Sequence, residues 1–464
     1  MRTLSLSLLP LLALVPRVAL AQAPQPDIKR EAAPTDLLKA TPDGLTADRV
    51  SERAVATSYS AKASEEALRG AAARVDAAWA NFLPRLSLLA RYTRLSDYTS
   101  RPFVFGGMAF ANPFQPILDN WTLQASITVP ISDYFLRINQ VYSASTLSRD
   151  AARFDVAAAR AKAGADGRVA YYTWLRARGG QVVAIQALSD QKTHLTDAKN
   201  VFTVGRASKA DVLRAETAVA AAELTVERAK NLVELTDKQI HIAMHEGDTA
   251  FVPGESLDAP VPLFQGNLQQ LIQEATTARM EVRSIEANAA AAGKSATATR
   301  AGILPQLAGV ASVTGANPNA RLVPTSAEWF PTWDVSLHLT WSPNDVFISA
   351  KQGASIDAQA DQLMAQRDVV RDGITLEVTQ AYQQVKEAEF ALDTGKRELT
   401  SAQEAYRVAH ELFINGSATS TTLTDSETEL TRARLDLLNA QVDARVARVR
   451  LEHAAGRDAK LSPY

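Results

Sequence analysis

Two histidines are the first residues whose type and spacing suggest chemistry. His241 and His245 stand four positions apart, which places both on one face of a helix at the spacing of a metal site. No third ligand lies close by in the sequence, so neither a metal nor any other cofactor is predicted. The chain also lacks a phosphate-binding glycine loop, a nucleophile elbow and a paired-carboxylate motif. We therefore predict no catalytic residue and expect that the protein is not an enzyme.

Composition argues against two further features. The 464 residues carry 49 Lys and Arg against 51 Asp and Glu, without a long basic block, so nucleic acid is not an expected partner. The chain contains no cysteine. Neither disulfides nor an N-terminal lipid anchor on cysteine is therefore expected.

The first 21 residues are typical of a secretory signal peptide. Arg2 supplies the positive end, a short apolar run follows over 4–15, and Ala19-Leu20-Ala21 fits the small-residue rule for cleavage. A buried N-terminal helix is the less favoured alternative. No later stretch reaches about 18 continuous apolar residues, so a membrane-spanning part would have to be a closed β-barrel.

The rest of the chain divides into two similar halves, each with a long helix, two strands and a very long helical stretch broken by one turn. Pro84 and Pro305 follow Leu in similar contexts, 221 positions apart, and Gly205 and Gly416 punctuate the helical stretches, 211 apart. Landmarks in one order at nearly one spacing indicate an internal duplication. The expected segments are a signal peptide at 1–21, a linker at 22–44, a first repeat at 45–246, a connecting segment at 247–266, a second repeat at 267–456 and a tail at 457–464.

The helical stretches carry the three-four spacing of a left-handed coiled-coil seam. Apolar or small residues recur in this way from Ala47 to Phe82, from Val212 to Val233 and from Leu430 to Leu451. A second stripe beside the last seam suits a helix with neighbours on both sides, as in a ring of helices, and the core of a bundle is the alternative. This second stripe comprises Leu435, Leu438, Val442, Val446 and Val449.

One stretch predicts a long rod. Residues 136–200 contain no proline and would reach roughly 95 Å as a single helix. Its glycines are candidate bends, because each costs about 1 kcal/mol relative to alanine in a helix. These glycines are Gly164, Gly167, Gly179 and Gly180.

Four strands are expected, at about 86–95, 121–131, 306–314 and 332–342. From Trp121 and from Trp333, apolar and polar residues alternate over about ten positions, as a transmembrane β-strand requires. A half-buried strand in water alternates in the same way, and the other two strands are assigned by their place in the repeat. Four strands are too few to close a barrel, and edges left open in lipid would cost several kcal/mol per backbone group. Three copies pooling twelve strands would satisfy both constraints.

These motifs resemble the TolC-like outer-membrane efflux proteins over essentially the whole mature chain. The most specific match is the run from Val204 to Ala215 around the first helical turn, and the run from Phe413 to Thr419 is similar to the second turn of the family. The resemblance implies a mainly α fold with a small β part: a homotrimer whose twelve-stranded β-barrel lies in the outer membrane of a Gram-negative bacterium, continued into the periplasm by a long antiparallel α-helical coiled-coil barrel. Its implied function is that of a passive exit duct in efflux or type I secretion.

The resemblance also implies partners and site residues. A periplasmic adaptor and an inner-membrane efflux pump or ABC transporter would dock at the end away from the membrane lipid. The family's adaptor-docking role carries over to the residues of the two turns, namely Val204, Gly205, Arg206, Ser208, Asp211, Asn415 and Gly416. The periplasmic aperture of the family is narrowed by two aspartates, whose positions are occupied here by Thr422 and Asp425. A ring of three Asp425 side chains would favour cations, and an ordinary solvated aspartate is the alternative.

The gating latch of the family is incomplete in this sequence. In the family, the aspartate equivalent to Asp211 pairs with an arginine, and Ala418 occupies that arginine's position here. Asp211 is left with two roles, pairing with Arg214 or capping the following helix, and we favour the cap.

A rival interpretation from a different class is a soluble periplasmic coiled-coil scaffold or adaptor. Its strands would then form a sandwich facing water. The tryptophans at the strand ends and the turn motif favour the channel, and no lipoyl-like β-domain of an adaptor is evident between the helices.

Overall fold

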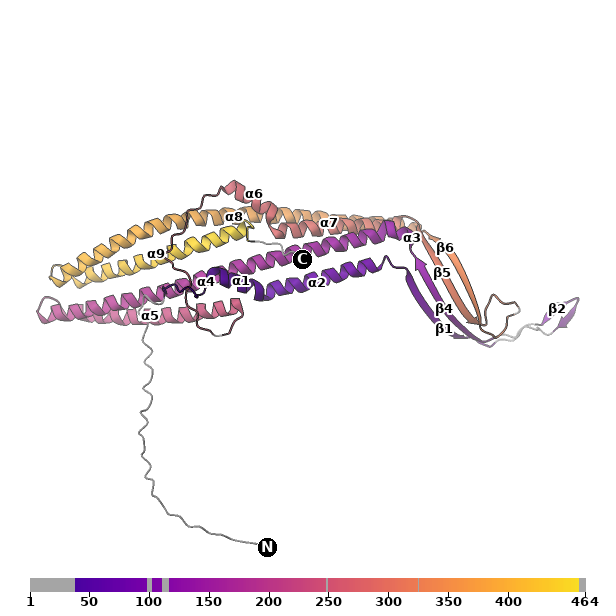
Figure 1. The fold of residues 1–464 in the computed structure, drawn as a ribbon, viewed down its shortest axis with the longest axis horizontal. Helices are drawn as coiled ribbons and strands as arrows, with labels where there is room; N and C mark the ends of the chain where they lie inside the picture. The colour runs from indigo at the N-terminus through magenta and orange to yellow at the C-terminus, as the bar shows by residue number, and fades with distance from the viewer. Residues whose placement is uncertain (1–37, 98–101, 111–116, 248, 324, 459–464) are drawn as a thin grey trace, which may run out of the picture.

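The computed structural model describes residues 38–97, 102–110, 117–247, 249–323 and 325–458. A long helical rod carries a four-stranded sheet at one end, and the sheet bends away from the axis of the rod (Figure 1). The expected signal peptide lies outside the described residues, as do most of the linker and most of the tail.

The seam that begins at Ala47 belongs to two helices instead of the single long helix that we expected. α1 (Ala47–Thr57) and α2 (Tyr59–Ala80) are separated at Ser58, whose backbone is not helical and whose hydroxyl accepts from the N–H of Ala61. The second repeat breaks at the matching position: α6 (Leu268–Ala278) and α7 (Met280–Arg300) meet at Arg279, 221 positions after Ser58. The break is therefore part of the duplicated unit.

Two antiparallel helical hairpins form most of the rod. The first comprises α4 (Asn139–Thr203) and α5 (Lys209–Met244), and the second α8 (Pro343–Ile414) and α9 (Ser420–Ala454). α4 runs for 65 residues without a break, or about 100 Å at 1.5 Å per residue.

The glycines of α4, which we expected as candidate bends, lie within one uninterrupted helix. A Cβ on Gly167 would lie 3.0 Å from Cβ of Ala54 in α1, and a Cβ on Gly179 would lie 2.5 Å from Cδ1 of Leu438 in α9. Gly167 and Gly179 therefore let α1 and α9 approach α4 closely.

The connecting segment between the repeats is fixed to the rod by arginines. Arg445 donates to the backbone carbonyls of Ser256, Leu257 and Ala259. Arg178 donates to the carbonyl of Phe251 and stacks over the ring of Trp174. Beneath this segment lies an apolar cluster, and its fully buried members include Val50, Tyr171, Trp174, Leu175, Ile240 and Val442.

The sheet consists of two adjacent hairpins, one from each repeat. β1 (Arg85–Arg94), β4 (Asp119–Val129), β5 (Gln306–Asn317) and β6 (Phe330–Thr340) lie in the order β1-β4-β5-β6, and every neighbouring pair is antiparallel. A small hairpin of β2 (Phe103–Phe105) and β3 (Met108–Phe110) lies between β1 and β4 in the sequence. β1 and β6 each have only one partner strand among the described residues, so both edges of the sheet are open.

Short helical turns join the sheet to the rod. β4 leads through α3 (Ile131–Asp133) and a π-helical turn, η2 (Tyr134–Ile138), into α4. α7 leads through a 3₁₀ turn, η3 (Ala301–Ile303), into β5. Among the helices of the described residues, none has both the length and the apolar character needed to cross a membrane.

Candidate functional site

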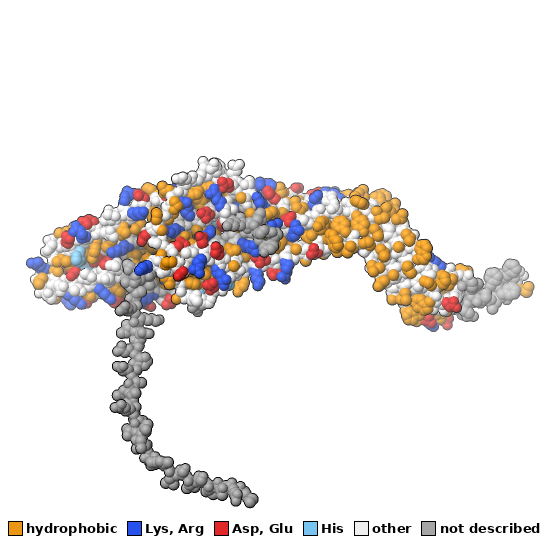
Figure 2. All heavy atoms as spheres, in the orientation of Figure 1, with side chains coloured by type: hydrophobic (Ala, Val, Ile, Leu, Met, Phe, Trp, Pro, Cys, Tyr) orange, Lys and Arg blue, Asp and Glu red, His pale blue; other side chains and the backbone are white. Residues whose placement is uncertain are grey.

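The two faces of the sheet differ in polarity, as the alternation predicted. Trp333, Val335, Leu337 and Leu339 of β6 are each at least 70% exposed on one face. Figure 2 shows hydrophobic side chains gathered over the sheet, while charged side chains cover the helical rod. The opposite face carries Ser87 hydrogen-bonded to Ser126, and Ser312 hydrogen-bonded to Asp334. A sheet with one exposed apolar face and one polar face has the pattern of the wall of a membrane barrel.

The two helical turns that the resemblance selected lie together at the end of the rod away from the sheet (Figure 1). Beneath them, an apolar cluster of Ala198, Val201, Ala215, Ala409, Phe413 and Leu423 joins the two hairpins. A Cβ on Gly416 would lie 3.6 Å from Cδ of Arg206, so the two turns approach each other. Residues about 211 positions apart in the sequence therefore form one surface.

Both turns have the same local geometry. Gly205 and Gly416 adopt φ of 76° and 74°, the left-handed region that favours glycine. In the first turn, N–H groups of Gly205 and Arg206 donate to carbonyls of Phe202 and Val201, which is the Schellman arrangement. The second turn repeats it around Gly416. The glycines thus end the long helices, which leaves Val204, Arg206 and Asn415 exposed at the turns.

Asp211 takes part in a capping box at the start of α5. Its carboxylate accepts hydrogen bonds from the hydroxyl of Ser208 at 2.6 Å and from the Ser208 backbone N–H at 2.9 Å. The Ser208 hydroxyl also accepts from the Asp211 backbone N–H, which completes the box. These bonds to Ser208, and the nearby Arg214, hold the pKa of Asp211 below its usual value. Asp211 both caps the helix and pairs with Arg214 at 3.2 Å, so the two roles considered from the sequence coexist.

The aperture candidates lie in the first turns of α9. Thr419 caps this helix and accepts from the N–H of Thr422, so Thr422 occupies the position that Asp211 has in the first repeat. Asp425 is exposed, and its side chain makes no hydrogen bond or ion pair with any residue that the structure describes. The next turns bury Leu423, Glu427 and Leu430 on the opposite side of the helix.

A buried polar network near the turns was missed by the sequence analysis. His194 of α4 and Glu427 of α9 are 1% and 3% exposed, and Nδ1 of His194 lies 3.0 Å from Oε2 of Glu427. The same carboxylate oxygen accepts from the amide of Gln191, and Nε2 of His194 lies 3.3 Å from the hydroxyl of Ser420. The network therefore connects the first hairpin to the second just inside the turns.

Exposed apolar side chains surround the two turns and were also missed. They are Phe202, Val204, Leu213, Leu412 and Ile414, each more than 40% exposed. A group of exposed apolar side chains at the end of a rod is typical of a contact surface, although further along the rod Val369 and Phe390 are exposed as well.

The two histidines with metal-site spacing have other contacts. Both ring nitrogens of His241 lie within 3.0 Å of backbone carbonyls, those of Asp237 and Thr249. His245 ends α5 in the left-handed conformation, and its ring packs edge-on against Tyr59. They fix the end of α5 to its surroundings.

Comparison with known proteins assigns the family. The profile of the outer membrane efflux protein family matches residues 50–241 and 271–457. A search of curated proteins gives no match. Among solved structures, the outer-membrane channel OprN is similar at a TM-score of 0.74, with 17% identity over 93% of this chain and 96% of that one. The CmeC outer membrane channel of Campylobacter jejuni has a TM-score of 0.73 at 15% identity over 91% and 88%. The outer membrane protein VceC of Vibrio cholerae has 0.70 at 17% over 88% and 96%.

The sheet and the helical rod thus have the fold of an outer-membrane channel protomer. This chain belongs to the outer membrane efflux protein family. It is an exit duct of the outer membrane and not an enzyme, and the soluble scaffold is not favoured. The family is trimeric and works with periplasmic adaptors and inner-membrane pumps.

Proposed function

We propose that three copies of this chain form a passive duct that receives substrates from an inner-membrane pump through a periplasmic adaptor docked on the two helical turns. The observation that carries the proposal is the sheet, which is apolar on one face, polar on the other and open at both edges. Pairing β6 of one copy with β1 of the next would close twelve strands around a polar lumen. Within each copy, residues 45–246 and 267–456 would be two structural repeats, joined by a connecting segment at 247–266.

Cell fractionation tests the duct itself. We expect a trimer that detergent extracts from the outer membrane. Release of a monomer by osmotic shock would instead support the soluble scaffold and refute the proposal.

The adaptor-docking surface is proposed at Val204, Gly205, Arg206, Ser208, Asp211, Asn415 and Gly416. Two features support this assignment: both turns lie at the end of the rod away from the apolar sheet, and exposed apolar side chains surround them. The contact would combine those apolar side chains with the exposed guanidinium of Arg206.

Site-directed crosslinking tests the docking surface, because the chain has no native cysteine. We expect Val204→Cys to crosslink to the cognate adaptor in intact cells. Glu227→Cys, which is also exposed on the first hairpin but six turns from its end, is the matched control. Equal crosslinking of both variants would refute an adaptor contact confined to the turns.

The periplasmic aperture is proposed at Asp425 and Thr422. Three unpaired Asp425 carboxylates around the axis would attract cations where the duct is narrowest. Asp425→Ala should then reduce the cation preference of the reconstituted channel, and Thr422→Asp should increase it by adding a second ring. A cation preference that neither variant alters would discard the assignment.

A further inference from the structure

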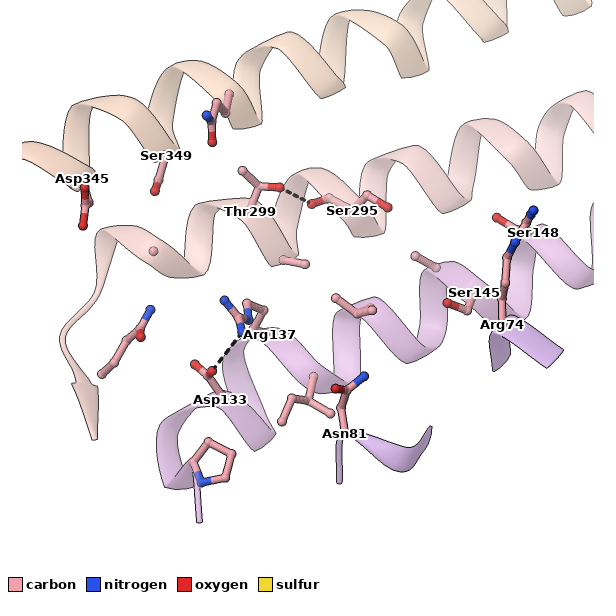
Figure 3. A pocket seen from close by; sticks show the side chains of 18 of the residues that line it. Arg74, Asn81, Asp133, Arg137, Ser145, Ser148, Ser295, Thr299, Asp345 and Ser349 are labelled. Atoms are coloured by element: carbon pink, nitrogen blue, oxygen red, sulfur yellow. Dashed lines mark hydrogen bonds and ion pairs between the residues drawn. The ribbon is translucent and has the colours of Figure 1, made fainter. Parts of the chain in front are cut away.

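A cavity of about 910 Å³ lies where the sheet meets the rod. Its walls come from α2, α4, α7 and α8, and its end is formed by the first residues of β1 and β5 and the last residues of β4. Figure 3 shows polar side chains of all four helices directed into this space. Nothing in the proposed function accounts for it.

The cavity opens on the polar side of the sheet. Its strand residues are Arg85, Thr128 and Gln306. Arg85 pairs with Thr128 in the β1–β4 register, on the same face as the hydrogen-bonded pair Ser87 and Ser126. Side chains alternate along a strand, so the exposed apolar residues next to them point to the other face. The cavity wall therefore belongs to the lumen side of a closed barrel.

The lining mixes polar and aliphatic side chains, and its charged side chains supply more unpaired positive than unpaired negative charge. Three arginines contribute, Arg74, Arg85 and Arg137, and two aspartates, Asp133 and Asp345. Arg137 is paired with Asp133 at 3.5 Å, but neither Arg74 nor Arg85 forms an ion pair with any residue that the structure describes. Hydroxyl and amide side chains fill the intervening positions, namely Asn81, Ser145, Ser148, Ser295, Thr299, Ser349 and Gln352.

Close contacts hold this part of the chain in place. The hydroxyl of Ser132, in α3, accepts a hydrogen bond from the backbone N–H of Leu307 at 2.9 Å, and this bond connects α3 to β5. A Cβ on Gly302 would lie 2.5 Å from Oγ of Ser349, so η3 packs tightly on α8. The π-helical turn η2 supplies Arg137 to the lining. The cavity is therefore formed by fixed elements before any solute arrives.

We propose that this cavity is a binding subsite for solutes carrying carboxylate or phosphate groups as they pass along the duct. Guanidinium groups bind such anions through paired N–H donors, and the neighbouring hydroxyls and amides supply further donors. The three copies of a trimer would present six unpaired arginines around the lumen at this level, against three unpaired aspartates. The inference rests on the proposed duct, because only a closed trimer turns this wall into a passage.

Block of the channel current by multivalent anions tests the subsite. The full-length protein is reconstituted into planar bilayers at low salt, and the current is titrated with citrate in one series and pyrophosphate in another. Low salt is needed because the Debye length is only about 10 Å at 0.1 M. We expect both anions to reduce the current of the unaltered protein.

The double variant Arg74→Gln with Arg85→Gln should raise the half-blocking concentration by at least about tenfold, because the loss of even one hydrogen bond to a charged group corresponds to a factor of that size. Arg69→Gln is the matched control, because Arg69 lies on the same helix, pairs with Glu66 and does not line the cavity. Block by citrate alone would restrict the subsite to carboxylates, and block by pyrophosphate alone would restrict it to phosphates.

The outcomes separate the subsite from the duct. A conducting channel that anions do not block, or that they block equally in the double variant, overturns the subsite and leaves the duct intact. A protein that conducts no current in any form refutes the duct itself. A selective loss of block in the double variant, with the control unchanged, supports both.

Discussion

Removal of the Glu427 carboxylate should loosen the entrance end of the rod. In the structure this group accepts hydrogen bonds from Gln191 and the ring of His194, and it is 3% exposed. A hydrogen bond to a charged group contributes about 1.5–3 kcal/mol, so the loss of two costs at least about 3 kcal/mol. Since 1.4 kcal/mol corresponds to a factor of ten, local separation of α4 and α9 should become roughly a hundredfold more frequent.

Hydrogen exchange followed by mass spectrometry measures that opening directly. In detergent-solubilised protein, Glu427→Ala should speed amide exchange in the first turns of α9 and in the facing part of α4, without changing exchange in the sheet. Glu429→Ala is the control, because Glu429 is exposed on the same helix two residues away. Replacing the pair together, His194→Phe with Glu427→Leu, should recover only part of the loss, because the two facing groups become apolar together while Gln191 and the buried Ser420 each lose a hydrogen-bond partner. Equal exchange in Glu427→Ala and Glu429→Ala would refute the reasoning.

Three further predictions concern other parts of the rod. The carboxyl of Asp211 has a lowered pKa, so its capping contribution is present above the unfolded pKa of about 4 and is lost as pH falls through the folded pKa. Over that acidic range, amide hydrogen exchange in the first turn of α5 should accelerate in the unaltered protein but not in Asp211→Asn. Gly179→Ala should destabilise by about 1–3 kcal/mol because its Cβ meets α9, whereas Gly180→Ala, facing open space, should stabilise by up to about 1 kcal/mol; equal melting temperatures would contradict this. Arg445→Gln should expose the connecting segment to proteolysis, because three carbonyls lose their donor, while the exposed control Arg450→Gln should not.

Local patterns in the sequence were sufficient for the architecture. The alternation from Trp121 and Trp333 is a property of consecutive residues, and it predicted both the strands and their two faces. The glycines at 205 and 416 marked the turns for the same reason, because the left-handed conformation that ends a helix strongly favours glycine whatever lies around it. The duplication then extended these assignments to strands with weaker patterns.

Features that depend on residues distant in the sequence were not predictable. The seam runs without interruption through Ser58, so nothing in the spacing revealed the break there. Gly179 lies in a tight contact only because Leu438 faces it, more than 250 positions away. His194 and Glu427 lie 233 positions apart, and neither is unusual until α4 and α9 are placed side by side.

The two open edges of the sheet have a consequence for the life of the protein before assembly. A single folded copy would expose two strand edges with unpaired backbone groups next to a broad hydrophobic surface. This combination favours non-specific strand pairing with any similar chain. The species prone to aggregation is thus a correctly folded monomer that has not yet assembled with other copies. Cells that make this protein must keep the concentration of unassembled monomers low, through chaperone binding, prompt delivery to the bilayer or rapid degradation.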